Sequence, residues 1–312
     1  MRVLVTGAAG FIGATLVDLL RRRGTIGGRA VTALALVDQS VADAGDALAI
    51  SGDLAEAATL RAIADFQADV VFHLAAVPGG AAEADPALGR RVNLDASLSL
   101  FELLAASGRR PVLVYASSIA VYGANLPDLV TPQTPLRPPL TYGAHKQVCE
   151  ILLADFTRRG AIDGRSVRLP GIVARPGNGT GLVSAFMSDI LYALRDGKPF
   201  VCPVGPASTA WWMSTSRCTE NLLHAAVMDV PAGEAARAWP LPVLRLSMAE
   251  VITTCAKLYG ADRQQVTFQP IPGVEAVFGR YPRLDDAPSR ALGLRDDGSA
   301  DALVRRALGE IE

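Results

Sequence analysis

The chain has 312 residues, half of them hydrophobic, and its 30 lysines and arginines nearly balance 31 aspartates and glutamates, for a formal net charge of −1. This length allows one large or two coupled domains, and the balanced charge argues against a nucleic-acid-binding surface. Because the sequence lacks an apolar run of about eighteen residues and starts at once with a strand pattern, we expect neither a membrane span nor a signal peptide.

The first informative stretch is a short apolar run, residues 3–6, followed by Gly7, Gly10 and Gly13 and then by a second apolar segment. The pattern predicts a buried strand, a tight turn and a helix. Glycine at these points permits unusual backbone angles and close approach of a pyrophosphate, while the helix N-terminus offers N–H donors. An ordinary strand-to-helix turn would look similar, so the following residues must decide.

A second strand is predicted over residues 30–37, and it is closed by Asp38. Dinucleotide-binding folds place a carboxylate here against the adenosine ribose, although aspartate is also a common turn residue. Together with the glycine turn, Asp38 indicates a dinucleotide site. Gln39, Ser40 and Val41 follow, without an arginine or lysine for a 2′-phosphate, so we expect NAD rather than NADP.

Strands and helices alternate as far as Pro170, which predicts an α/β fold with a doubly wound parallel sheet and ligands at the carboxyl ends of its strands. Asp53 follows one strand end, where it would accept from the adenine amino group or cap the next helix. Another strand end is followed by Leu74, Ala75 and Ala76. These residues would let the backbone lie against the cofactor, or they form an ordinary loop. The later strands are predicted at residues 48–50, 70–74, 112–116 and 166–169, and the first of the later helices at 57–64.

Two longer amphipathic helices are predicted over residues 87–106 and 142–159. Each would either cover the sheet or pair with its copy in a second subunit. We favour a homodimer.

The second of these helices carries Tyr142 and Lys146, four residues apart and therefore on one face. The chain has only three lysines, so chance pairing is improbable. A tyrosine phenolate usable near pH 7 needs about 4 kcal/mol of stabilisation, and an ammonium at about 4 Å supplies roughly that much. Ser118 would donate to a substrate oxygen as Tyr142 takes its proton. The plainer alternatives are a turn-capping serine and a lysine on a solvated face.

Beyond Pro170 the pattern changes to segments rich in glycine and proline, with helices at residues 214–228, 247–259 and 300–308. We expect a cofactor-binding domain over residues 1–170 and a smaller, partly interleaved substrate lobe over 171–312, with residues near 209–246 returning to the first domain. Four cysteines and three histidines lack the spacing of metal ligands. We therefore expect no metal site, no disulfide framework and a reducing cytoplasm.

Together the glycine turn, Asp38, residues 73–76, residues 117–123 and the Tyr142–Lys146 pair resemble the extended short-chain dehydrogenase/reductases, which include nucleotide-sugar epimerases and dehydratases. The resemblance covers essentially the whole chain. It implies a Rossmann domain with bound NAD, a catalytic trio of Ser118, Tyr142 and Lys146, and Asn93 near the ribose or an active-site water. The predicted cofactor set is Gly7, Gly10, Phe11, Ile12, Gly13, Asp38, Asp53, Leu54, Leu74, Ala75, Ala76, Asn93, Tyr142, Lys146, Pro170 and Ile172.

One position separates the members of this family. Nucleotide-sugar enzymes usually carry an asparagine after the sixth strand, whereas this chain has Gly171. Residues 73–80, 83–85, 118–124, 168–177 and 247–248 are instead similar to family members that oxidise four-carbon sugar acids beside the carboxylate. That resemblance implies an NAD-dependent dehydrogenase of a small sugar acid. A nucleotide-sugar 4-epimerase or dehydratase with tightly bound NAD is the alternative; a non-catalytic NAD-sensing module would not need the trio.

A small acid substrate requires cations or donors in the second lobe, where arginine best fits a carboxylate. Arg175 or Arg217 would supply the cation, unless Arg175 pairs with a surface acid. Trp211 and Trp212 would contact the substrate or pack the lobe, and His145 is expected on the helix surface. The predicted substrate set is Ser117, Ser118, Tyr142, Arg175, Asn178, Trp211 and Arg217.

Overall fold

The computed structural model describes residues 1–176 and 183–311. They form two compact units, each assembled from separate parts of the chain. The first comprises Met1–Val121, Pro138–Arg168 and Thr219–Pro240; the second comprises Tyr122–Arg137, Leu169–Cys218 and Leu241–Glu312. The expected boundary at residue 170 lies beside the crossing after Arg168, and the short segment Tyr122–Arg137 belongs to the second unit.

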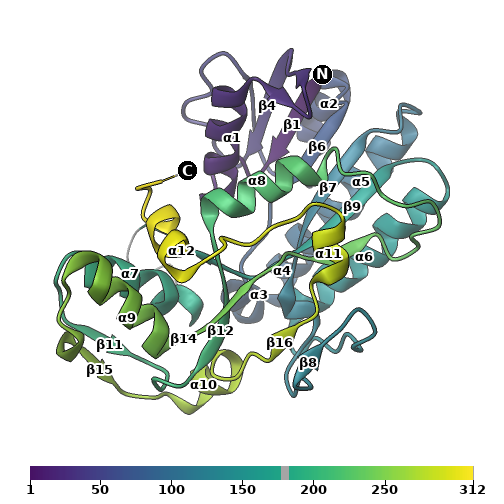
Figure 1. Cartoon of the computed structure of the whole chain (residues 1–312). Helices are drawn as coiled ribbons and strands as arrows, with labels where there is room; N and C mark the ends of the chain where they lie inside the picture. The colour runs from purple at the N-terminus through teal and green to yellow at the C-terminus, as the bar shows by residue number, and fades with distance from the viewer. Residues whose placement is uncertain (177–182, 312) are drawn as a thin grey trace. The chain divides into compact units, whose positions relative to one another are not determined.

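The first unit is built on a seven-stranded parallel sheet, in the order β13-β9-β7-β6-β1-β4-β5 (Figure 1). The chain runs outward from β1 through β4 to β5 and then returns to β6 on the other side of β1. Such a reversal opens a crevice at the carboxyl ends of the central strands. The prediction of a doubly wound sheet is confirmed. The strands are β1 (Arg2–Thr6), β4 (Ala33–Asp38), β5 (Leu48–Ser51), β6 (Val70–His73), β7 (Val112–Ser118), β9 (Asp163–Leu169) and β13 (Ala238–Pro240).

The helices of the first unit connect these strands. The predicted helix over 87–106 is three consecutive pieces, α4, a π-helical turn η1 and α5. The helical elements are α1 (Phe11–Arg23), α2 (Ala57–Phe66), α3 (Gly79–Ala84), α4 (Pro86–Arg90), η1 (Arg91–Asp95), α5 (Ala96–Ala106), the 3₁₀ turn η2 (Ile119–Val121), α6 (Thr141–Arg158) and α8 (Thr215–Ala225), whose first four residues belong to the second unit. A small hairpin pairs β2 (Thr25–Ile26) with β3 (Arg29–Ala30).

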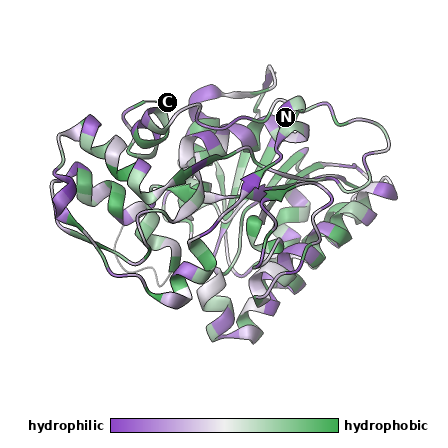
Figure 2. Ribbon diagram, turned by 60° about the horizontal axis from the view of Figure 1, so that its bottom comes forward, coloured by the Kyte–Doolittle hydropathy of each residue, from purple (hydrophilic) through white to green (hydrophobic). Residues whose placement is uncertain are grey.

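The sheet is buried on both faces. Val3, Leu4 and Val5 are consecutive on β1 and are all fully buried, as expected for a parallel strand covered on both sides. On one face, Phe101 of α5 and Leu153 of α6 pack in the same apolar cluster as Leu4. Figure 2 shows the strands of this sheet largely in the hydrophobic colour. The apolar core thus fixes where the polar strand ends lie.

The second unit contains three small sheets, in the orders β10-β12-β14, β11-β15 and β16-β8. Its own core includes Trp212, Met187 and Ile190. Its strands are β8 (Leu129–Val130), β10 (Gly171–Val173), β11 (Phe200–Cys202), β12 (Thr209–Ser214), β14 (Leu244–Ser247), β15 (Val266–Phe268) and β16 (Arg283–Leu284). Its helices are η3 (Val183–Ala185), α7 (Phe186–Arg195), α9 (Met248–Tyr259), η4 (Arg263–Gln265), α10 (Pro272–Phe278), α11 (Ala287–Ala291) and α12 (Ala300–Ala307).

In the part of the chain that the structure describes, no helix combines the length and apolar character needed to cross a membrane.

Candidate active site

The glycine turn between β1 and α1 is shaped so that only glycine fits. Gly7 has φ +71°, and a Cβ there would lie 2.7 Å from the backbone nitrogen of Ala75. A Cβ on Gly13 would lie 2.0 Å from the carbonyl oxygen of Gly7. Gly10 is the N-cap of α1 and offers no side-chain acceptor, so the first-turn N–H groups can meet an external anion. This cradle fits the pyrophosphate of a dinucleotide.

Asp38 is held between the glycine turn and its own strand end. Its Oδ2 accepts from the Ala9 N–H at 2.9 Å, and its Oδ1 accepts from the Gln39 N–H at 2.8 Å. A carboxylate has about four lone-pair sites, so capacity remains for a pair of ribose hydroxyls. The fixed orientation of Asp38 fits the adenosine end of a dinucleotide.

Asp53 has other partners in this structure. It forms an ion pair with Arg91 on η1, and its Oδ1 accepts from the Ala55 N–H at 2.9 Å. The N-cap residue of α2 is Glu56 rather than Asp53, so the capping alternative is not realised. Leu54 beside it is buried. Contacts of Asp53 with the adenine and of Leu54 with the cofactor stay predictions.

A buried histidine organises the loops beyond β1 and β6. The Ser97 hydroxyl donates a hydrogen bond to the backbone carbonyl of Asn93. Because its proton is used there, the Ser97 oxygen accepts a hydrogen bond from Nε2–H of His73 at 2.9 Å. Nδ1 of His73 then accepts from the Thr6 hydroxyl at 2.7 Å. This assigns the neutral Nε2–H tautomer. Complete burial lowers the pKa of His73 to about 3, which keeps the ring neutral.

The same network reaches the predicted cofactor loop. The side-chain amide of Asn93 donates to the Val77 carbonyl at 3.0 Å and accepts from the Val77 N–H at 2.7 Å. The Ala75 N–H donates to the Thr6 hydroxyl. Asn93 is 1% exposed, so here it positions the loop over residues 74–77; its contact with the ribose stays a prediction. Sequence reasoning missed the role of His73, whose signal was a histidine directly after three buried strand residues.

Ser118, Tyr142 and Lys146 come together in the first unit. Ser118 ends β7, and Tyr142 lies on the first turn of α6, near enough for the Ser118 hydroxyl to act on the pKa of the phenol. One turn later, Lys146 lies with its Nζ 5.6 Å from the centre of the Tyr142 ring and donates to the Ala116 carbonyl at 2.7 Å. Lys146 is 2% exposed, which excludes the alternative of a solvated helix face. The structure therefore places a hydroxyl, a phenol and an amino group near one another, from residues that the sequence singled out by their type and spacing.

Two close contacts fix the start of α6 beside Ser118. A Cβ on Gly143 would lie 2.5 Å from the carbonyl oxygen of Ala120 in η2, so glycine allows the helix to approach the residues that follow Ser118. Glu83 of α3 accepts from the Thr141 N–H and so caps α6, in the absence of a side-chain cap from Leu140. Both contacts set the position of Tyr142.

Burial acts on both titratable members of the trio. It raises the pKa of Tyr142 to about 12, against the smaller opposing effect of the Ser118 hydrogen bond. It lowers the pKa of Lys146 to about 8, while Cys149 and, to a smaller extent, the charge of Glu150 act in the opposite direction. Desolvation disfavours the charged form of each group. The protein alone thus holds Tyr142 as a neutral phenol at pH 7.

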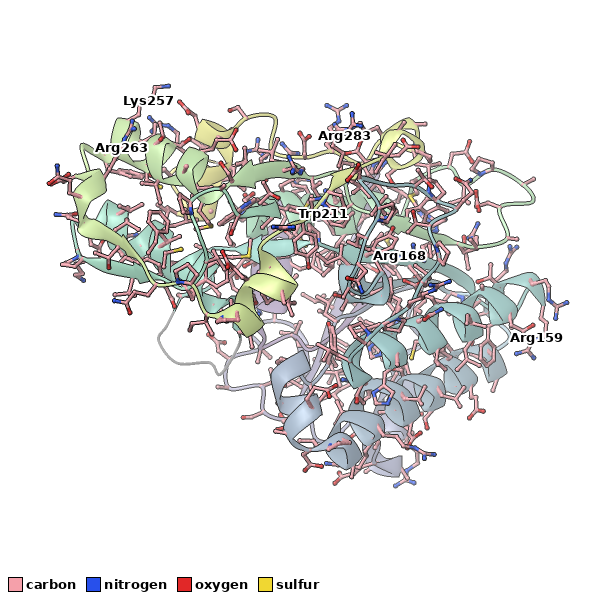
Figure 3. All side chains as sticks on the ribbon, turned by 90° about the horizontal axis from the view of Figure 1, so that it is seen from below. Arg159, Arg168, Trp211, Lys257, Arg263 and Arg283 are labelled. Atoms are coloured by element: carbon pink, nitrogen blue, oxygen red, sulfur yellow. The ribbon has the colours of Figure 1, made fainter. Side chains whose placement is uncertain are left out.

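A second buried group adjoins the trio, and sequence reasoning missed two of its three members. Arg168 on β9 binds Glu150 of α6 through two hydrogen bonds of 2.8 and 2.9 Å. The Ser117 hydroxyl donates to the same carboxylate at 2.5 Å. All three are less than 9% exposed as whole residues, and Figure 3 shows Arg168 among packed side chains, unlike Arg159 at the periphery. We call these residues the Glu150 cluster. The hydroxyl of Ser117 is committed to it, so contact of Ser117 with substrate stays a prediction.

The other predicted substrate residues lie in the second unit. Trp211 is 1% exposed and its indole N–H donates to the Pro282 carbonyl at 2.7 Å, which is the packing role of the plainer alternative. Arg217 lies in the first turn of α8, where its charge opposes the burial that raises the pKa of Asp297. Arg175 is partly buried, which lowers the pKa of its guanidinium. Asn178 lies outside the described residues. Substrate contacts of these four stay predictions.

Pro170 and Ile172, predicted to contact the cofactor, flank Gly171 at the start of the second unit. Pro170 is buried, and Ile172 lies on β10 opposite Met213 of β12. A Cβ on Gly171 would lie 2.9 Å from the Trp211 carbonyl oxygen and 2.7 Å from Met187 Cε. The space at residue 171 is therefore too small for an asparagine side chain without movement of its neighbours.

Comparison with known proteins assigns the chain to a family. A sequence profile described as the NAD dependent epimerase/dehydratase family matches residues 3–213. The chain belongs to this epimerase/dehydratase family. D-Erythronate dehydrogenase from Cupriavidus necator is 38% identical over 98% of this chain and 97% of the relative. The enzyme of the same name from Haemophilus influenzae is 28% identical over 98% of each chain.

Solved structures agree with this membership. A nucleoside-diphosphate-sugar epimerase from Agrobacterium tumefaciens superimposes with a TM-score of 0.91 at 31% identity, covering 98% of this chain and 92% of that one. A UDP-glucose 4-epimerase from Thermus thermophilus, solved with NAD, has a TM-score of 0.80 at 22% identity over 99% and 98% of the two chains, a likeness of fold alone. With dehydrogenases as full-length relatives, this member of the epimerase/dehydratase family is an NAD-dependent dehydrogenase with an NAD-type cofactor.

Proposed function

We propose that the chain oxidises the 2-hydroxyl carbon of a small sugar acid, D-erythronate or a close relative, with NAD as the acceptor and the 2-oxo acid as the product. The observation that carries the proposal is the 38% identity over nearly the full length to a D-erythronate dehydrogenase. It is supported by the grouping of Ser118, Tyr142 and Lys146 in one unit. Their chemistry suits proton removal from an alcohol.

The three residues would divide the work. Ser118 donates a hydrogen bond to the substrate hydroxyl oxygen, and the phenolate oxygen of Tyr142 takes the hydroxyl proton as the C2–H bond breaks and a C=O bond forms. Bound NAD supplies the acceptor for the hydride. Lys146 Nζ lies 5.6 Å from the centre of the Tyr142 ring, and an ammonium at about that distance from a phenolate charge contributes about 3 kcal/mol at an effective dielectric of 20. The positive charge of oxidised nicotinamide adds to this. Oxidation should therefore be faster at mildly alkaline pH.

NAD rather than NADP is the proposed acceptor. The Asp38 carboxylate, oriented by Ala9 and Gln39, would accept from ribose hydroxyls and would repel a 2′-phosphate. Gln39, Ser40 and Val41 add no cation. The specificity constant with NAD should exceed that with NADP by at least about a hundredfold, since repulsion and a lost hydrogen bond add up to about 3 kcal/mol.

We further propose that Arg175 and Arg217 bind the substrate carboxylate, because an arginine fork fits a carboxylate. Each change to alanine should raise KM for the acid about tenfold or more, as expected for a lost charged hydrogen bond, with a smaller effect on kcat. If both variants keep wild-type KM, the carboxylate is bound elsewhere.

One observation favours a second candidate function. The 31% identical structural relative carries the name of a nucleoside-diphosphate-sugar epimerase, so a nucleotide-sugar 4-epimerase or dehydratase is the alternative. The crowding around Gly171 speaks against it, because nucleotide-sugar enzymes usually carry an asparagine there. Binding of uridine diphosphate, together with NAD that leaves only on denaturation, would favour this alternative.

We propose a cytoplasmic homodimer as the working form. α6 exposes Ile151 by 61% and Val148 by 39%, three residues apart and so on one helical face, where a second copy would cover them. The four cysteines are free and buried, which suits a reducing compartment. Sedimentation at micromolar concentration should give a dimer, and Ile151→Asp should give a monomer. A wild-type monomer would remove the dimer from the proposal.

The deciding experiment is NADH formation by the purified protein across a panel of four-carbon sugar acids, with NAD and then NADP. We expect turnover on erythronate or a diastereomer of it with NAD. Absence of turnover on every acid, combined with uridine diphosphate binding, would replace the proposal by the epimerase alternative.

A further inference from the structure

The Glu150 cluster adjoins two members of the trio. Ser117 precedes Ser118 on β7, and Glu150 follows Lys146 by one turn of α6, on the same buried face. The carboxylate of Glu150 accepts from Ser117 and from two nitrogens of Arg168. One side chain therefore joins the serine strand, the helix of Tyr142 and Lys146, and strand β9.

The order in which the trio loses protons gives this placement its significance. The pKa of Lys146 is about 8 and that of Tyr142 about 12, both shifted by burial. On these values Lys146 becomes neutral before Tyr142 can ionise, and the attraction between ammonium and phenolate is lost. Any group that keeps Lys146 charged therefore widens the pH range in which Tyr142 can act as a base.

Several titratable groups face Lys146, but burial favours the neutral form of most of them. Tyr115 lies under its Nζ at 4.6 Å from the ring centre, and burial raises the pKa of that phenol far above its usual value. His73 is held neutral, as described above. Burial likewise raises the pKa of the Cys149 thiol. Among the described residues, the facing groups are His73, Tyr115, Tyr142, Cys149 and Glu150.

Glu150 is thus the carboxylate in this set. We propose that Glu150, held by Arg168 and Ser117, is a positioning residue that keeps Lys146 in its charged form and holds Ser118 in register with Tyr142. The inference rests on the proposed roles of the trio. Glu150 acts through Lys146 and Ser118 and does not touch the reacting atoms.

The small number of lysines makes a direct test possible. Lysine labelled with ¹³C at Cε gives three resonances, from Lys146, Lys198 and Lys257, and the Lys146→Arg variant assigns the first. Lys198 and Lys257 lie in exposed ion pairs with Asp196 and Asp301, so they serve as internal references. Titration of the free protein then reports the Lys146 pKa without any turnover.

Glu150→Gln keeps the size of the side chain and one acceptor oxygen for Ser117 and Arg168 Nε, while it removes the charge and the second acceptor, which faces Arg168 Nη2. It should lower the Lys146 midpoint by on the order of one pH unit. The double variant Glu150→Gln with Arg168→Met also removes the neighbouring positive charge, so its midpoint should lie between those of Glu150→Gln and the wild type. A purely structural role predicts the reverse order, because the double variant disturbs packing more. If Glu150→Gln alone does not fold, the double variant carries the test.

The matched control is Asp163→Asn, which breaks the ion pairs of Asp163 with Arg165 and Arg237 at the start of β9. It should lower the melting temperature and leave the Lys146 midpoint unchanged. In the catalytic assay, Glu150→Gln should move the alkaline limb of the kcat–pH profile to lower pH by the amount seen in the titration. Ser117→Ala should lower kcat several-fold without moving Lys146.

A Lys146 midpoint that is the same in folded Glu150→Gln and wild type would overturn the inference. So would an equal shift in Asp163→Asn. Failure of the proposed substrate would look different: the Lys146 midpoints would keep their order while no sugar acid is turned over.

Discussion

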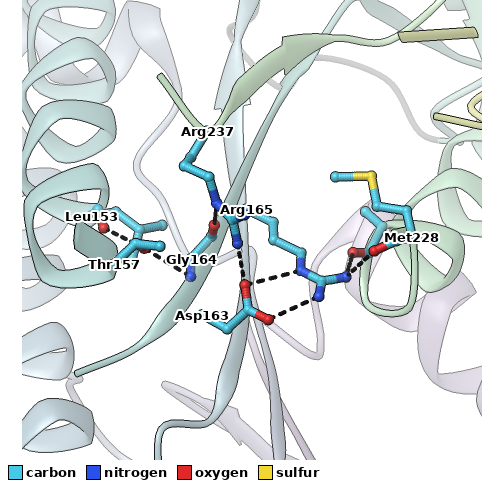
Figure 4. Close-up of polar contacts among 8 residues, drawn as sticks. Leu153, Thr157, Asp163, Gly164, Arg165, Met228 and Arg237 are labelled. Carbon is cyan, nitrogen blue, oxygen red and sulfur yellow. Dashed lines mark hydrogen bonds and ion pairs between the residues drawn. The ribbon is translucent and has the colours of Figure 1, made fainter. Parts of the chain in front are cut away.

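Strand β9 carries two arginine–carboxylate groups, and they serve its two ends differently. Near its start, Asp163 lies between Arg165 and Arg237 and pairs with both (Figure 4). Nη1 of Arg165 also donates to the carbonyls of Ala225 and Met228, at and after the end of α8. We call this the Asp163 cluster. Besides their pairing with Asp163, its arginines donate to backbone carbonyls, whereas the hydrogen bonds of the Glu150 cluster join side chains beside the proposed catalytic trio.

The contrast shows what a buried ion pair does and does not indicate. In both clusters the arginines are mostly buried, with side-chain exposures of 10% for Arg165 and for Arg168. Desolvation offsets much of the attraction in such pairs, so burial alone does not imply a large gain in stability. What separates the clusters is their neighbours: backbone carbonyls beside Arg165, and a titrating lysine one turn from Glu150. The predictions below test this separation.

The largest expected effect is at the carboxyl end of the sheet. Tyr142→Phe removes the proposed base and keeps the ring that packs beside Gly79, so kcat should fall about a thousandfold. The affinity for NAD and the melting temperature should stay near wild type. Steady-state kinetics, calorimetry and thermal unfolding measure the three quantities. A variant that keeps more than a tenth of wild-type kcat would remove Tyr142 from the mechanism.

At the start of β9 the expectation is reversed. Asp163→Asn leaves two guanidinium groups without their carboxylate, which should lower the free energy of unfolding by about 2 kcal/mol, less than for a fully buried pair because Asp163 is partly exposed. The kcat and KM values should stay within about twofold, since additivity holds between separated sites. Urea unfolding and kinetics of the same preparation measure both. Loss of activity at full stability would refute the separation of the two clusters.

Geometry between the trio members is tested by a single methyl group. Gly143→Ala places a Cβ 2.5 Å from the Ala120 carbonyl oxygen, which should push the first turn of α6 away from η2. A shift of about 1 Å between Ser118 and Tyr142 should lower kcat by roughly 10- to 100-fold. The control is Gly273→Ala on α10, where a Cβ meets no atom within 4 Å. Equal kcat in the two variants would show that the approach of α6 to η2 is unimportant.

The parts of the site that are marked by short local patterns were predictable from the sequence. Glycines spaced three apart, an aspartate at a strand end and a tyrosine four residues before a lysine all follow from helix and strand periods. The alternation of strands and helices gave the parallel sheet in the same way. Each of these features is local, so a short window of residues contains all the information needed.

The Glu150 cluster and the His73 network were not predictable because their members lie far apart in the chain. Arg168 meets Glu150 across 18 residues and Ser117 meets it across 33, and a lone glutamate on an amphipathic helix looks like a surface residue. Their pairing is decided by the strand order, in which β9 adjoins β7. Trp211 is a different case: the sequence offered both substrate contact and packing of the lobe, and the structure gives Trp211 burial and a backbone hydrogen bond, while its contact with substrate stays a prediction.

The smallest expected effect concerns pH and the His73 network. Burial lowers the pKa of His73 from 6.5 to about 3. Below pH 6.5 the His73 ring is therefore protonated in the unfolded chain but stays neutral in the folded protein. The stability due to the neutral ring is therefore complete above pH 6.5 and is lost as the pH falls toward 3. Between pH 7 and pH 5.5 this loss amounts to about 1 kcal/mol.

Urea unfolding at the two pH values measures that loss. In the His73→Asn variant, which keeps a donor and an acceptor without the titration, this part of the pH dependence should vanish, whereas His145→Gln, at a less buried histidine, should remove less of it. The ¹⁵N shifts of His73 should keep the Nε2–H pattern from pH 8 to pH 5. A titration midpoint of His73 near pH 6.5 would mean that the ring is not buried and hydrogen-bonded between Thr6 and Ser97. The loop over residues 74–77 would then be positioned by Asn93 without the His73 network.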